Sequence, residues 1–127
     1  MSVPSESERV QWVRYAADCA ERVLPIVPPR FRGQAEAAIV AARLWADEPT
    51  EMHRTDAWMA AYAATCIAAS DCVYAAVYAA DAAAHATHAI YAGYAAVSAV
   101  CASLDPAQER VWQAERRKYY GLPEAMP

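Results

Sequence analysis

The fold class is decided by a long alanine-rich stretch, residues 57–104, which reads AWMAAYAATCIAASDCVYAAVYAADAAAHATHAIYAGYAAVSAVCASL. The whole chain has 127 residues, of which 33 are alanine, 3 are glycine and 1 is phenylalanine. Alanine has the highest helix propensity of all residues and is depleted in strands. The sequence therefore predicts an all-α protein and excludes all-β and doubly wound folds.

This stretch is too long to form one helix in a compact domain. A single helix over residues 57–103 would be about 70 Å long at about 1.5 Å per residue. A compact chain of this length has a radius of gyration of only about 14 Å, so the stretch must fold back at least once. The best positions for a new helix to begin are Ser70-Asp71 and Thr87.

Helix ends are marked on both sides of the stretch. Ser5 and Glu8 form a capping-box pattern, and apolar residues then recur at helical spacing as far as Leu24. The prolines within residues 25–29 end this first helix and predict an extended connector. The second helix should carry its apolar face on Ala35, Ala38, Ile39, Ala42 and Trp45, with Arg43 on the other face.

The remaining end signals complete a set of five or six helices. Thr50 is a good N-cap, Asp105-Pro106 with Gln108 opens the last helix, and Gly121 is placed to end it. The chain is thus predicted to be a single domain, residues 1–127, folded as a compact alanine-rich bundle with an ordered core over about 6–121. The predicted helices cover residues 6–24, 33–46, 51–69, 71–84 and 87–102, and a sixth runs from Pro106 to Gly121.

Alanine leaves little side-chain volume to fill the core. The bulky residues are therefore expected to supply much of the buried area. They are Trp12, Trp45, Trp58, Trp112, Tyr62, Tyr74, Tyr78, Tyr91 and Tyr94.

The four cysteines have neither zinc-knuckle nor CxxC spacing. They are interpreted as reduced, small apolar residues of the helices, and no secretory signal is visible at the N-terminus, so a cytoplasmic protein is expected. These residues are Cys19, Cys66, Cys72 and Cys101.

Negative charge is concentrated in the middle of the chain. Residues 47–105 carry seven acids and one base, a net charge of −6, while residues 1–46 and 106–127 each carry +1, which together give the net charge of −4. Such a segment favours a basic partner and argues against nucleic acid. The candidate partner-binding residues are Asp47, Glu48, Glu51, Asp56 and Asp71.

Two other features were weighed against nucleic-acid and membrane binding. Arg116, Arg117 and Lys118 stand at the end of the last helix, where interaction with the helix dipole explains them better than a nucleic-acid patch does. Residues 82–104 carry no formal charge, but they are mostly alanine, include two histidines and lack basic flanking loops. Neither nucleic-acid nor membrane binding is predicted.

The sharpest candidate for chemistry is Asp81, His85 and His88, which share one helix face at positions i, i+4 and i+7. Such residues can perform general acid/base work or ligate a metal. Three ligands stacked along one helix cannot converge on one ion unaided, so we predict no metal and no cofactor. The alternative function is that of a small-molecule-binding protein or a small helical enzyme of a biosynthetic pathway, in which an aromatic pocket with Tyr78 would surround Asp81, His85 and His88.

Three segments carry a resemblance to a known family. They are Trp12 with CAERVLP at residues 19–25, AIVAARLWA at residues 38–46, and HATHA at residues 85–89. Over about residues 12–102 the chain resembles the putative immunity proteins of bacterial polymorphic toxin systems. The resemblance implies an all-helical cytoplasmic protein that binds and neutralises a cognate toxin without chemistry of its own. It leaves a homodimer open.

Overall fold

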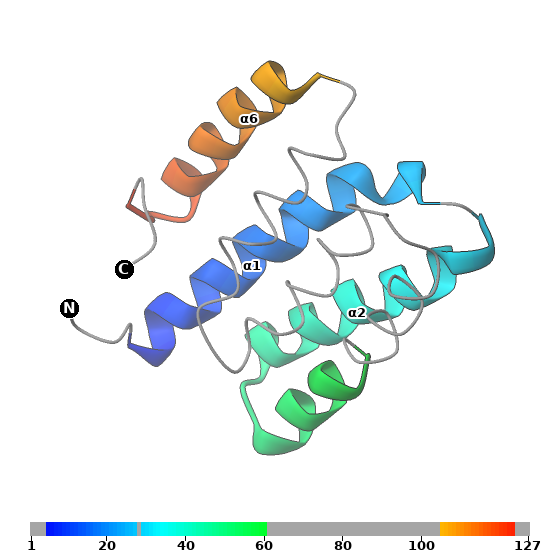
Figure 1. Ribbon diagram of the computed structural model, residues 1–127. Coiled ribbons are helices and arrows are strands. Elements are labelled where there is room, and N and C mark those ends of the chain that lie inside the picture. The colour runs from blue at the N-terminus through cyan, green and yellow to red at the C-terminus, as the bar shows by residue number, and fades with distance from the viewer. Residues whose placement is uncertain (1–4, 28, 61–104, 124–127) are drawn as a thin grey trace.

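The computed structural model describes residues 5–27, 29–60 and 105–123, and all regular structure in these ranges is helical (Figure 1). The α-helices are α1 (Glu6–Val23), α2 (Pro29–Asp47) and α6 (Pro106–Tyr119), with a 3-10 helix, η1, at Leu24–Ile26. Residues 51–60 are also helical. The all-α class is confirmed for this part of the chain, whereas the predicted helices 71–84 and 87–102 lie outside it.

Helix α1 begins as predicted, but the segment that follows it does not. The Ser5 hydroxyl accepts a 3.2 Å hydrogen bond from the Glu8 backbone amide, which caps the first turn. The prediction of an extended connector after this helix was wrong, because Leu24–Ile26 form a 3-10 turn closed by a 3.0 Å bond from the Val27 amide to the Leu24 carbonyl. A proline near the start of a short helix fits, since its fixed φ is helical and its missing N–H is not needed there.

Helix α2 begins at Pro29, four residues before the predicted start at Gly33. The proline was interpreted only as a stop signal, yet proline is also favourable at the first position of a helix. The predicted apolar face of α2 is confirmed, because Ala35, Ala38, Ile39, Ala42 and Trp45 are all buried.

The position predicted for Arg43 was wrong. Its side chain does not lie away from the core but at the edge of α2, where it reaches across to Asp18 on α1.

The last two helical segments begin at the predicted caps. The Thr50 hydroxyl accepts a 3.2 Å bond from the His53 amide, and an Asp105 carboxylate oxygen accepts one of 3.2 Å from the Gln108 amide. Helix α6 ends as expected at Gly121, which has a φ of 71°. Bonds from Gly121 to the Lys118 carbonyl (3.0 Å) and from Leu122 to the Arg117 carbonyl (2.9 Å) complete a Schellman motif.

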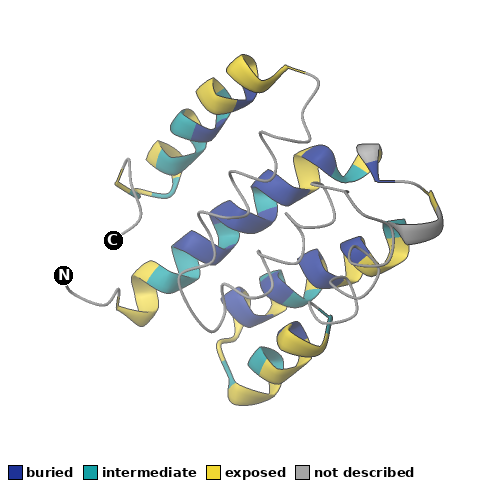
Figure 2. Cartoon of the chain, in the orientation of Figure 1, coloured by how far each residue is buried: buried dark blue, intermediate teal, exposed yellow. Residues whose placement is uncertain are grey.

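Helix α1 lies between α2 and α6 and carries buried residues along most of its length (Figure 2). Small buried residues such as Ala16, Ala20, Ala38 and Ala42 form much of the contact between α1 and α2, so the two backbones can approach closely. Trp12, Tyr15 and Trp45 supply the bulk of this core.

The aromatic residues predicted to fill the core therefore divide. Trp12 and Trp45 are buried and Trp112 is partly buried against the core, but the prediction for Trp58 was wrong, since it is 44% exposed. Tyr62, Tyr74, Tyr78, Tyr91 and Tyr94 lie outside the described residues. Within the described ranges, no helix has the length and apolarity needed to cross a bilayer.

Candidate functional site

Four of the five predicted partner-binding residues lie in the described part of the chain, and all four are exposed. Asp47 ends α2, Glu48 follows it, and Glu51 and Asp56 belong to the helical residues 51–60. We call these four residues the acidic surface. The fifth, Asp71, lies outside the described residues.

The acidic surface includes two ion pairs that leave its carboxylates accessible. Asp47 Oδ1 lies 3.3 Å from Arg14 Nη2, and Glu51 Oε2 lies 3.2 Å from Arg54 Nη1. The Arg54 guanidinium also lies 5.5 Å from the ring centre of Trp45, so this cation is drawn toward the core. The surface thus exposes carboxylates more than the arginines that pair with them.

The orientation of residues 51–60 is set by Ala57, which is fully buried and belongs to the main core cluster. Burial of this small side chain brings the helix close to the core and turns the opposite face outward. That face includes two large apolar residues, Met52 (68% exposed) and Met59 (59% exposed). The acidic surface is therefore combined with exposed apolar side chains.

The second predicted constellation cannot be placed. Asp81, His85, His88 and Tyr78 all lie outside the described residues. Among the residues that the structure does describe, no group of three or more His, Cys, Asp or Glu side chains is placed to hold a metal ion.

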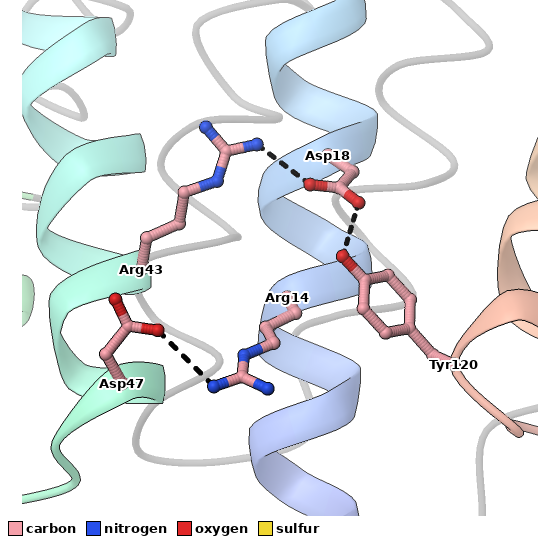
Figure 3. A pocket seen from close by; sticks show the side chains of 5 residues that line it. All are labelled: Arg14, Asp18, Arg43, Asp47 and Tyr120. Atoms are coloured by element: carbon pink, nitrogen blue, oxygen red, sulfur yellow. Dashed lines mark hydrogen bonds and ion pairs between the residues drawn. The ribbon is translucent and has the colours of Figure 1, made fainter.

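A charged network that the sequence analysis did not predict is centred on Asp18 of α1 (Figure 3). Its carboxylate is only 12% exposed. One oxygen accepts a 2.8 Å bond from Arg43 Nη2 of α2, and the other accepts bonds from Arg116 Nε (2.8 Å) and the Tyr120 hydroxyl (2.6 Å). Arg43 also donates to Glu21 through its other terminal nitrogen. Asp18 therefore joins α1, α2 and the end of α6.

The protonation states follow from this arrangement. Burial works to raise the pKa of the Asp18 carboxyl, but the three hydrogen bonds it accepts outweigh burial and hold the pKa below its usual value. Burial and the bond to Asp18 raise the pKa of Tyr120 to about 12, so the phenol keeps its proton and donates it. At neutral pH Asp18 is thus a fixed carboxylate rather than a proton carrier.

A small pocket of about 190 Å³ lies beside this network (Figure 3). Its four charged lining residues form two ion pairs, Arg14 with Asp47 and Arg43 with Asp18, and Tyr120 completes the lining. Every charge is balanced by a partner in the same pocket. The geometry supports a structural clamp and gives no free base or nucleophile to an enzymatic reaction.

Two further contacts attach α6 to α1. Arg22 Nε lies 3.0 Å from both carboxylate oxygens of Glu109, which is 4% exposed, and the Arg22 guanidinium lies 4.2 Å from the centre of the Trp112 ring. Arg117 Nη1 donates a 2.9 Å bond to the Tyr15 hydroxyl. The interpretation of Arg116 and Arg117 by the helix dipole was therefore incomplete, since each has a specific acceptor on α1.

The comparisons agree with the resemblance found in the sequence. A family model described as "Imm-5 like putative immunity protein" matches residues 2–119, which is nearly the whole chain. The protein belongs to this immunity-like family. Neither the curated proteins nor the solved structures gave a match.

Proposed function

We propose that this protein neutralises a cognate toxin by direct protein–protein contact through the acidic surface, with Asp71 as a further member. Membership of the immunity-like family is the observation that carries the toxin as partner. The exposure of Asp47, Glu48, Glu51 and Asp56 within ten residues of chain supports the choice of surface.

The charge of this surface points to a toxin whose complementary face is basic. Carboxylates that stay in water attract a positive partner at long range and so raise the rate of association more than the final affinity. At an ionic strength of about 0.15 M the Debye length is about 8 Å, so the attraction acts over the last approach and weakens with added salt. A toxin that binds nucleic acid would offer such a basic face.

Inhibition in this proposal is steric. Asp18 and its partners hold the described helices together, and none of these groups is free to act on a bound toxin. The protein would act in the cytoplasm, where it covers the toxin surface until the complex dissociates.

The direct test uses the toxin domain encoded beside the gene for this protein, purified separately. The two proteins should form a stable complex whose mass is measured by size-exclusion chromatography with light scattering, and toxin activity should fall to zero at stoichiometric protein. The same measurement on the protein alone decides between a monomer and a homodimer. A toxin domain that stays active and separate at micromolar excess of the protein would contradict the proposal.

The alternative function as a small-molecule protein keeps its own test, because Asp81, His85, His88 and Tyr78 lie outside the described residues. If these residues form a catalytic or ligand site, Asp81→Asn or His85→Gln should abolish activity while the helical circular dichroism signal is unchanged. Toxin neutralisation that survives both substitutions would contradict a role for this face in the immunity function.

A further inference from the structure

Met52 and Met59 form an exposed apolar stripe within the acidic surface. They are seven residues apart, which places them about 20° apart around the helix and about 10 Å apart along its axis. Both side chains are more than half exposed, at 68% and 59%. They project from the face opposite the buried Ala57, so the packing that attaches this helix also presents the two methionines to solvent.

Acidic residues border this stripe on both sides. At about 100° per residue, Glu51 lies to one side of the methionine pair and Asp56 to the other. Glu48 precedes the helix, so the N-terminal end of the stripe is acidic as well. An apolar centre inside a charged rim is the usual anatomy of a protein interface.

We infer that Met52 and Met59 are the apolar anchors of the toxin interface, and that they enter an apolar groove rimmed by lysine or arginine on the toxin. This inference rests on the proposed function and specifies the chemistry of its partner. Methionine suits the role because its flexible, polarisable side chain adapts to an irregular groove and is common at binding surfaces. Charge complementarity with the flanking acids selects a basic toxin rather than a second copy of this acidic chain.

The two parts of the surface should be separable by kinetics. Exposed charges act mainly on the association rate, whereas anchors that are desolvated in the complex act mainly on dissociation. The test variant is M52Q/M59Q, because glutamine has a similar length and keeps a high helix propensity. The control is V111Q, which changes a residue of α6 that is 60% exposed.

The experiment measures binding of an inactivated form of the toxin domain encoded beside the gene, by surface plasmon resonance. We expect M52Q/M59Q to dissociate at least ten times faster than wild type, with an association rate within threefold, and V111Q to match wild type. Peroxide footprinting by mass spectrometry should show slower oxidation of Met52 and Met59 in the wild-type complex.

The outcomes separate the two proposals. If wild type binds, but M52Q/M59Q dissociates at the wild-type rate and the methionines oxidise equally fast in the complex, the methionine anchors are wrong while the immunity function stands. If wild type does not bind the toxin domain, both proposals are overturned. Equal acceleration by V111Q would also contradict a specific role for the methionine stripe.

Discussion

Asp18 accepts a 2.8 Å hydrogen bond from Arg116, a residue 98 positions later in the chain. The same carboxylate accepts from Arg43 of α2, so one side chain fixes two other helical elements against α1. A carboxylate this deeply placed is stabilising only while its partners are present, because an unpaired buried charge is costly. The network therefore closes the structure on the side where α6 meets α1.

Removing the charge of Asp18 should destabilise the protein. In D18N the amide keeps the shape of the side chain but leaves two arginines without their shared carboxylate. We expect the free energy of unfolding to fall by about 2 to 4 kcal/mol, measured by urea denaturation followed by circular dichroism. E36Q, which changes an exposed acid of α2, is the control and should change stability by less than about 0.5 kcal/mol. A D18N protein as stable as E36Q would refute the clamp.

The same network predicts how stability depends on pH. The pKa of Asp18 is lowered in the folded protein, so between the folded pKa and the unfolded value of about 3.9 the unfolded chain binds more protons. The stabilisation is therefore complete above about pH 5 and is lost as the pH falls through the folded pKa. The gap in stability between wild type and D18N should be constant above pH 5 and should shrink below pH 4. A gap of constant size down to pH 2.5 would show that Asp18 does not titrate with folding.

Cys19 should be unreactive in the folded protein. It is a fully buried free thiol of α1, and its burial raises its pKa to about 12, so almost no thiolate is present at pH 8. Iodoacetamide should modify it only after unfolding, when mass spectrometry should find all four cysteines alkylated without prior reduction. Rapid alkylation of Cys19 in the folded protein would contradict its burial, and fewer than four alkylated residues would contradict the prediction of reduced cysteines.

Two glycine-to-alanine substitutions should have opposite effects on stability. Gly121 has a φ of 71°, which alanine adopts only at a cost of about 1 to 2 kcal/mol. Gly33 lies exposed in α2, and a methyl group there would meet no atom within 4 Å, so G33A should stabilise by about 0.5 to 1 kcal/mol. Thermal denaturation of both variants provides the comparison. A shift in the same direction for both would contradict the assignment of either backbone position.

What could be predicted from the sequence was local. Ser5, Thr50, Asp105 and Gly121 each cap a helix through neighbours within five residues, so their roles are visible in a short window. Proline gave a less certain signal, because the residue that stops one helix also starts another well, and Pro29 does the second.

The Asp18 network could not be predicted in the same way. Its partners stand between 25 and 102 positions away, and only the packing of α1 against α2 and α6 brings them together. The one local signal was a charged residue between the buried Ala17 and Cys19. The error at Trp58 has a similar cause, since hydrophobicity alone did not indicate that Ala57, its neighbour, would face the core.

The central claim is that the acidic surface guides binding of a basic toxin. The most direct test is the association rate of the inactivated toxin domain with E48K/D56K and with E36K/E115K, which change exposed acids elsewhere and bring the net charge to the same value. Arg116 and Arg117 are unsuitable controls because both are bonded to α1. We predict that E48K/D56K associates at least ten times more slowly than E36K/E115K at low salt, and that the difference narrows as salt is added. Equal rates for the two variants at every salt concentration would contradict the claim.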